Sequence, residues 1–244
     1  MRFYSKTDIG KKRYSNQDAV AGKIISNNLA WMVVCDGMGG NNGGDIASKI
    51  AIEVISKNIS DYLRENQNSE YIIGLMKESV ELASKAIFDE SKKDEDLKGM
   101  GTTVVLGVIN NNCLYVVHAG DSRAYLIRNA KIEQISTDHS MVQHMVEMGE
   151  ITAEEARNHS QKNIITKALG VESNVNPDHS IIELNDKDII LLCTDGLSNH
   201  LEDDEICKMF SKYSLEELPD ILINKCNARG GKDNITVSLI EYKN

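Results

Sequence analysis

Four uninterrupted apolar runs constrain the fold of this chain more than any other feature. They are "LAWMVVC" at 29–35, "TTVVLGVI" at 102–109, "CLYVVHA" at 113–119 and "DIILLC" at 188–193. Runs of this length without polar alternation are typical of strands that are covered on both faces. Shorter or more alternating runs indicate additional strands at 20–25, 122–127, 180–184 and 235–242.

Two long helices are predicted between the first and second of these runs. Apolar residues recur at steps of three and four over 46–63 and again over 71–90, which is the period of a helix with one buried face. Shorter helices are expected at 139–148, after Thr152, at 203–213 and at 218–226. Because strands and helices do not alternate strictly, the pattern favours an α+β fold over a doubly wound parallel sheet.

Composition limits the class of protein. The 244 residues contain only two prolines and no linker-like segment, so we expect a single domain over residues 1–244. A net charge of −10 argues against nucleic acid and anionic membranes as partners. Five cysteines without a C-x-x-C motif indicate free thiols in a reducing compartment. No apolar run reaches the ~18 residues of a membrane span, so we expect a cytoplasmic protein with no membrane insertion.

Aspartates stand at the ends of several apolar runs. Asp36, Asp121, Asp195 and Asp233 each lie within about two residues of such an end. An ionised carboxylate at the edge of a core costs free energy unless it is paired or bound to a cation. If the four side chains converge, their oxygens suit magnesium, manganese or calcium rather than zinc. From the residues alone, each aspartate is more often a turn residue, and one sequence does not show whether they converge.

Other hydrolytic chemistries find little support. No cysteine is followed by an arginine six positions later, and neither H-E-x-x-H nor G-x-S-x-G occurs. The six histidines show no zinc-ligand spacing with the cysteines. The glycine-rich loop "GMGGNNGG" lacks the Lys-Ser/Thr of a P-loop. A water molecule activated by metal ions needs no side-chain nucleophile, and it agrees with the aspartates.

The ordered motifs of the chain resemble those of one family. They are "RYSNQD" (13–18), "VCDGMGG" (34–40), "GTT" (101–103), "HAGDSRAY" (118–125), "DHS" (138–140), "ITKALG" (165–170), "CTDGL" (193–197) and "GGKDNIT" (230–236). This series resembles the metal-dependent serine/threonine protein phosphatases of type 2C, the PPM family, in their compact bacterial form. The resemblance implies an α-β-β-α sandwich of two antiparallel sheets flanked by helices, with a flap at about 136–170.

The resemblance also implies a set of metal ligands. Asp36 would bridge two Mn²⁺ or Mg²⁺ ions, the Gly37 carbonyl would bind the second ion, and Asp195 and Asp233 would complete the first. Asp121 would bind a third, weaker ion that many bacterial members carry, together with Asp195. On this basis the aspartates converge in a channel at one edge of the sandwich.

Two further roles follow from the same resemblance, and two positions depart from it. Arg13 would bind the substrate phosphate, and Asp18 would act through water bound to the metals. Relatives place a histidine, a candidate acid for the leaving group, where Met38 or Asn41 stands here. The proton donor to the leaving group is therefore left open by the sequence.

The implied activity is hydrolysis of phosphoserine and phosphothreonine in proteins. A bridging hydroxide would attack phosphorus directly, without a covalent phosphoenzyme. A cognate serine/threonine kinase is the expected counterpart, and relatives of this kind are commonly monomers. Two alternatives stay open: a pseudophosphatase that only binds phosphoproteins, and a phosphatase of small molecules.

Overall fold

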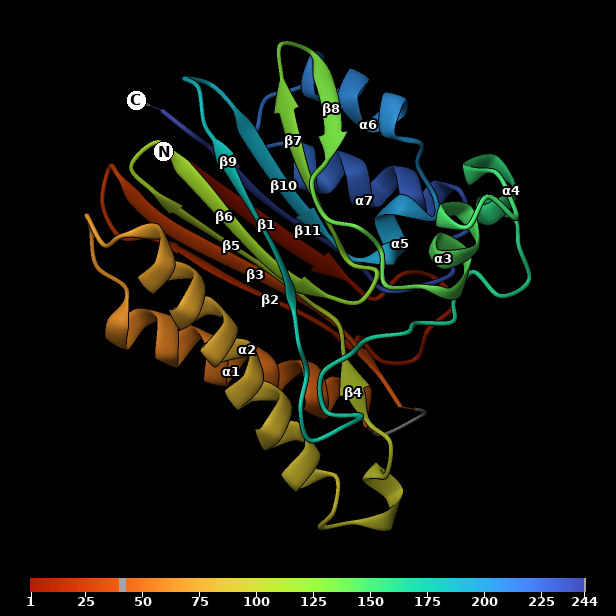
Figure 1. Ribbon diagram of the computed structural model, residues 1–244. Helices are drawn as coiled ribbons and strands as arrows, with labels where there is room; N and C mark the ends of the chain where they lie inside the picture. Colours follow the sequence, from red (N-terminus) through yellow and green to blue (C-terminus); the bar gives the residue numbers. More distant parts are fainter. Residues whose placement is uncertain (40–42, 244) are drawn as a thin grey trace.

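Two antiparallel sheets packed face to face form the centre of the molecule. The computed structural model describes residues 1–39 and 43–243, and Figure 1 shows helices on both outer faces of the sheet pair. Every pairing between described strands is antiparallel. The expected α+β class and α-β-β-α sandwich are confirmed.

Each sheet is assembled from strands that are distant in the sequence. The first has the order β2 (Asp18–Ile24), β3 (Leu29–Met38), β5 (Val104–Asn110), β6 (Cys113–Ala119) and β9 (Asp178–Glu183), and β4 (Gly101–Thr102) also pairs with β3. The second has the order β1 (Arg2–Asp8), β11 (Ile235–Glu241), β10 (Ile189–Cys193), β7 (Arg123–Arg128) and β8 (Lys131–Gln134). The two chain ends therefore meet as neighbouring strands, β1 and β11, of the second sheet.

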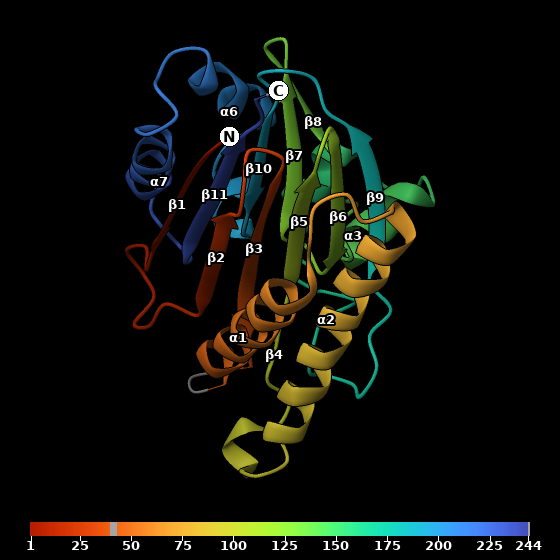
Figure 2. The ribbon, with the colours of Figure 1, turned by 90° about the vertical axis from the view of Figure 1, so that its left-hand side faces the viewer.

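The helices divide between the two outer faces and a segment beside the sandwich. The first sheet is covered by α1 (Gly44–Tyr62) and α2 (Ser69–Glu90), which Figure 2 shows side by side. The second sheet is covered by α5 (Asp195–Ser198), α6 (Asp203–Phe210) and α7 (Leu218–Ala228). The flap segment contains α3 (Met141–Glu147) and α4 (Ala153–Arg157), and a short 3-10 helix follows α2 at Glu95–Leu97.

Strand β3 shows why the apolar runs lack polar alternation. Leu29, Trp31 and Val33 pack toward α1 and α2, whereas Ala30 and Met32 enter the layer between the sheets. Both faces of the strand are thus removed from water, and full burial of each large apolar side chain contributes ~1.5–3 kcal/mol. The run at 29–35 predicted this correctly because successive strand residues point to opposite faces.

Several short or exposed elements escaped the sequence patterns, among them the 3-10 helix at Glu95–Leu97. Strands β1 and β8 lie at the two edges of the second sheet, where most of their residues stay partly or fully exposed, so they carry no apolar run. Helix α5 has only four residues, too few for a visible helical period. The run predicted at 102–109 is divided at Thr103, whose backbone N–H donates to the Asp36 carbonyl at 2.8 Å instead of continuing the ladder.

The state of the cysteines and the character of the helices complete the description of the fold. All five cysteines are free, and burial raises the pKa of the Cys226 thiol to about 12, so this side chain packs as a small protonated group. Within residues 1–39 and 43–243, none of the helices combines the length and apolar character required to cross a membrane.

Candidate metal centre

The strand register brings the aspartates to one end of the first sheet. Asp18 opens β2 and stands directly opposite Asp36 on β3. The same end of β3 adjoins the start of β5, which pairs with the end of β6, where Val104 faces Ala119. Asp121 follows β6 by two residues and therefore lies at this end as well.

Hydrogen bonds join this end to the second sheet. Asp18 Oδ2 accepts from Thr194 Oγ1 at 2.9 Å and from Thr236 Oγ1 at 2.7 Å. Thr194 follows β10 and Thr236 lies near the start of β11, and the Thr236 N–H donates to Thr194 Oγ1 at 3.0 Å. Asp195 and Asp233, which flank these two threonines in the sequence, are thereby held against the aspartates of the first sheet.

The electrostatics of Asp36 show that the five carboxyl groups converge. Burial raises the pKa of the Asp36 carboxyl well above its usual range. The negative charges of Asp18, Asp195, Asp121 and Asp233 raise this pKa further. Like charges raise a carboxyl pKa in this way only at short range, so the predicted gathering of aspartates is a property of the fold.

The other carboxyl groups are also held where ionisation is costly. Burial raises the pKa of Asp195 to about 6, of Asp18 to about 7 and of Asp121 to about 8, and neighbouring aspartates add to each shift. In the described part of the chain, one oxygen of each of these three side chains is buried without a hydrogen-bond partner. Asp195 and Asp36 nevertheless keep some solvent exposure.

A divalent cation fits this arrangement. Buried oxygens without donors, in a group of like charges, are stabilised when a cation is coordinated between them. The donors are hard carboxylate oxygens, which suit Mg²⁺ or Mn²⁺ better than Zn²⁺. The residues present are therefore compatible with the two- or three-metal set that the sequence implies.

Thr103 ties the turn that carries Asp121 to the strand that carries Asp36. Its hydroxyl accepts from the Asp36 N–H at 3.0 Å and shares a 2.7 Å hydrogen bond with Ser122 Oγ. Gly120 has φ +111°, and a Cβ at this position would collide with the Thr103 side chain. Only glycine therefore allows the turn to approach β3 so closely.

The loop that bears Arg13 is fixed by Asn234. This side chain is buried and donates to the carbonyls of Ile9 at 2.9 Å and Ser15 at 3.0 Å. Arg13 itself is half-exposed and donates from Nη2 to Asp233 Oδ2 at 2.8 Å. The guanidinium thus stands at the solvent side of the carboxylate cluster.

The residues around Gly37 meet the start of α1. The Gly37 N–H donates to the Gln17 carbonyl at 3.1 Å, and a Cβ on Gly37 would collide with the carbonyl oxygen of Gly44. Glycine is therefore needed here for the close strand-to-helix connection. Met38 is the last residue of β3, and Asn41 lies outside the described residues.

Comparison with known proteins identifies the family. The profile of the family described as Protein phosphatase 2C matches residues 10–228. The serine/threonine phosphatase stp of Listeria monocytogenes serotype 4b (strain F2365) is 38% identical over 242 residues, which cover 97% of this chain and 94% of that protein. The chain belongs to the protein phosphatase 2C family. It is accordingly a serine/threonine protein phosphatase, and phosphorylated proteins are its substrates.

Solved structures of phosphatases share the fold over the whole chain. The S. agalactiae serine/threonine phosphatase matches with a TM-score of 0.90 at 33% identity, covering 100% of this chain and 99% of that one. The catalytic domain of the phosphatase PstP, solved in complex with two manganese ions, matches with a TM-score of 0.88 at 31% identity. These alignments cover 100% of this chain and 98% of the PstP chain.

Next to the aspartate cluster of this phosphatase 2C lies a polar cavity. It measures about 730 Å³ and has Asp121 and Asp195 in its wall. The flap segment forms the opposite side through residues of α3, α4 and the following loop, among them Val142, Arg157 and Lys162. The flap predicted at 136–170 therefore borders the aspartates directly.

Sequence reasoning missed the residues that orient the aspartates in this phosphatase. Thr194 and Thr236 hold Asp18, and Asn199 Nδ2 donates to Asp195 Oδ2 at 2.9 Å. Both threonines stand inside the quoted motifs "CTDGL" and "GGKDNIT", and Asn199 is four residues beyond Asp195. The four-residue spacing could have predicted that contact if α5 had been recognised as a helix.

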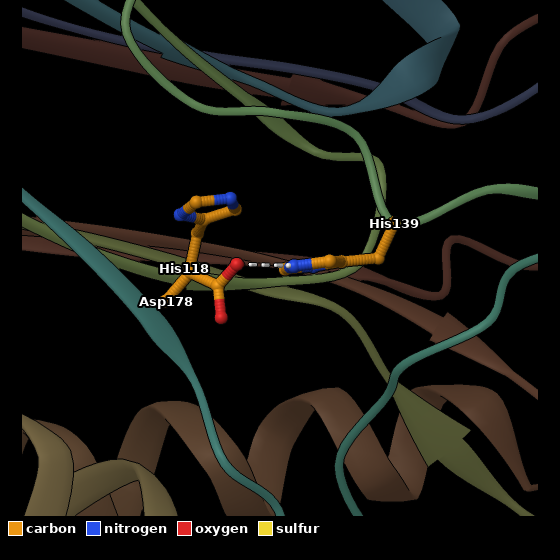
Figure 3. Close-up of side chains that lie close together, drawn as sticks. All are labelled: His118, His139 and Asp178. Atoms are coloured by element: carbon orange, nitrogen blue, oxygen red, sulfur yellow. Dashed lines mark hydrogen bonds and ion pairs between the residues drawn. The ribbon is translucent and has the colours of Figure 1, made fainter. Parts of the chain in front are cut away.

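A second cluster of titratable side chains was not predicted. His118, His139 and Asp178 place possible ligand atoms within 4.8 Å of one another. Figure 3 shows these three side chains, with His139 Nε2 in contact with Asp178 Oδ2 at 3.1 Å. The two histidines lie in the quoted motifs "HAGDSRAY" and "DHS", but Asp178 carries no motif that could have indicated the contact.

Proposed function

We propose that the aspartate cluster is the catalytic metal centre of this serine/threonine phosphatase. Asp36 would contact two divalent cations, Asp195 and Asp233 the first, and the Gly37 carbonyl the second. Asp121 would bind a third, weaker cation together with Asp195. The observation that carries this proposal is the set of buried carboxylate oxygens without hydrogen-bond partners in a group of mutually repelling charges.

The identity of the cations follows from the donor set and from a relative. Hard oxygen donors favour Mn²⁺ or Mg²⁺. The catalytic domain of PstP was solved in complex with two manganese ions and matches over all of this chain. When bound, such a pair of ions activates a water molecule and stabilises negative charge on the phosphoryl group.

The side chains around the centre supply binding and orientation. Arg13 presents a planar, permanently charged guanidinium that is suited to two phosphate oxygens, and its present partner is Asp233. Asp18 accepts two hydroxyl hydrogen bonds with one oxygen, while the other oxygen is buried without a partner, so it would orient bound water. Direct attack by water on phosphorus explains why no cysteine or serine nucleophile is required.

The cavity beside the flap supports a protein substrate. Its volume of about 730 Å³ exceeds what a phosphate group alone needs, and Asp121 and Asp195 lie in its wall. The flanking residues of a phosphorylated segment would occupy this space. We place the enzyme in the cytoplasm as a single-domain monomer. It would remove the phosphate groups that a cognate serine/threonine kinase adds. Size-exclusion chromatography with light scattering tests whether the protein is a monomer.

Metal-dependent turnover is the direct test of this proposal. Hydrolysis of p-nitrophenyl phosphate and of a phosphothreonine peptide is measured with Mn²⁺ and again after EDTA treatment. We expect activity with Mn²⁺, loss with EDTA, and a higher kcat/KM for phosphopeptides than for metabolite phosphates. Undiminished activity in EDTA contradicts the metal centre, and a preference for metabolite phosphates contradicts the protein substrate.

A further inference from the structure

His139 contacts both backbone polar groups of Gly120, which belong to two consecutive peptide groups. The backbone N–H of His139 donates to the Gly120 carbonyl at 2.9 Å, and the Gly120 N–H donates to His139 Nδ1 at 3.1 Å. Gly120 immediately precedes Asp121. The His139 side chain therefore holds the peptide between Ala119 and Gly120, and the His139 backbone holds the peptide that leads into Asp121.

These contacts determine the tautomer of His139. Because Nδ1 accepts a hydrogen bond, a neutral ring carries its proton on Nε2, which can donate to Asp178 Oδ2 at 3.1 Å (Figure 3). Asp178 also accepts from Lys167 Nζ at 2.8 Å. Partial burial opposes ionisation, but the hydrogen bonds from Lys167 and His139 lower the pKa of Asp178 to about 2. The carboxylate is therefore charged and fixes the proton on Nε2.

This tautomer argues against the three residues as a metal site. A cation on His139 Nε2 would require the proton on Nδ1, where it would face the N–H of Gly120. The Lys167 ammonium on Asp178 would also repel a cation. The His118 ring instead stacks on His139 with 4.9 Å between centroids, and its Nε2–H donates to the Thr137 carbonyl at 2.9 Å. The arrangement is a hydrogen-bonded chain that ends at Gly120.

This series of hydrogen bonds also joins the flap to the proposed metal centre. The His139 carbonyl accepts from the Thr166 N–H at 2.9 Å, so His139 links the two segments that enter and leave the flap. On the opposite side of the turn, Gly120 is packed against Thr103. Gly120 is thus clamped between Thr103 and the flap base, and one oxygen of the following residue, Asp121, stays buried without a partner.

We propose that His139 is a positioning residue for Asp121, which it holds in place for the third cation through the backbone of Gly120. The proposal rests on the role of Asp121 given above. In this arrangement Asp178 and Lys167 fix the tautomer, and the flap base and the third cation are coupled through one imidazole ring. A partner that positions a ligand is commonly worth about 10- to 100-fold in metal affinity.

Two amide substitutions distinguish the role of Nδ1 from the role of Nε2 in His139. In His139→Asn the side-chain oxygen can take the place of Nδ1 and accept from Gly120, whereas in His139→Gln the terminal amide reaches the place of Nε2 and retains Asp178. His139→Ala loses both contacts. Each variant is compared with wild type and with Asp121→Ala, which provides the reference for loss of the third cation.

The readouts are the Gly120 amide resonance in metal-free protein and calorimetric titration with Mn²⁺. We expect His139→Asn to keep the resonance position and to bind the weakest Mn²⁺ within about threefold of wild type. His139→Gln and His139→Ala should shift the resonance and weaken this Mn²⁺ by about 10-fold or more, with the two tighter ions retained.

Each contrary outcome has a distinct meaning. Equal behaviour of the Asn and Gln variants indicates a general structural role for His139 and overturns the proposal. A Mn²⁺ ion that is lost from His139→Asn but kept by Asp121→Ala shows that the histidine cluster itself binds metal, which also overturns it. If Asp121→Ala leaves every Mn²⁺ affinity unchanged, the role of Asp121 in the proposed function fails instead.

Discussion

The aspartate cluster and the histidine cluster lie on either side of one turn, yet their carboxyl groups have opposite properties. Burial and neighbouring negative charges raise the pKa of Asp121 to about 8, and one of its oxygens has no partner. Asp178 accepts from Lys167 and His139, and its pKa falls to about 2. A buried carboxyl oxygen without a donor is suited to a cation, whereas a carboxylate whose oxygens already have donors serves to orient its neighbours.

The largest effect is expected from Asp36, the residue at the centre of the repelling charges. Asp36→Asn should lower kcat with Mn²⁺ by about 1,000-fold or more, because the amide lacks the negative charge with which Asp36 would hold divalent cations. Asp89→Asn, on the exposed part of α2, is the matched control and should retain wild-type kinetics. Comparable kcat values for Asp36→Asn and wild type would contradict the placement of the catalytic cations.

Removal of Asp121 should have an intermediate effect. Asp121→Ala should keep two tightly bound Mn²⁺ ions while activity falls by roughly 10- to 100-fold, because only the third cation loses its ligand. Calorimetric titration counts the ions, and initial rates at saturating Mn²⁺ measure the activity. Loss of all metal binding would show that Asp121 belongs to the main pair of sites.

Stability without metal should depend on pH through the raised aspartate pKa values. The folded protein retains protons near pH 6 to 8 on Asp195, Asp18 and Asp121, whereas unfolded aspartates release theirs near pH 4. This contribution to stability is complete below about pH 4 and is lost as pH rises through about 6 to 8. In EDTA, Tm should therefore fall by several degrees between pH 5 and 8.5, at about 2–4 °C per kcal/mol.

Two comparisons test the cause of this pH dependence. Addition of Mn²⁺ should restore Tm at pH 8, because the cations replace the protons between the carboxylates. Asp36→Asn should show a shallower pH dependence in EDTA, since it removes one of the repelling charges. A slope that is identical in wild type and Asp36→Asn would assign the effect to groups elsewhere in the protein.

The smallest effect is expected in the histidine cluster, at its solvent side. Lys167→Ala removes a partly exposed ion pair to Asp178, and such pairs are worth about 0–1 kcal/mol. The free energy of unfolding, measured in urea, should therefore change by less than about 1 kcal/mol. Mn²⁺ affinities should stay close to wild type because His139 still donates to Asp178. A loss as large as that of Asp121→Ala would place Lys167 within the metal centre.

The sequence by itself determined the layers of this protein and the residue types of its centre. Apolar runs such as 29–35 predicted strands covered on both faces. The resemblance carried by the ordered motifs predicted the sandwich and the flap, and the metal-binding role that it implies for the aspartates stays a prediction. Edge strands β1 and β8 were missed because partial exposure leaves no apolar pattern. The short helix α5 was missed because four residues cannot show a period.

Only the tertiary structure decided which side chains meet. Thr194 and Thr236 contact Asp18 across 176 and 218 residues of sequence, and His139 reaches back 19 residues to Gly120. No local pattern encodes such contacts, because they arise from the register of strands in two sheets and from the path of the flap base. The same cause separates Asp121 from Asp178: identical side chains acquire opposite pKa shifts from the donors and charges that the fold places beside them.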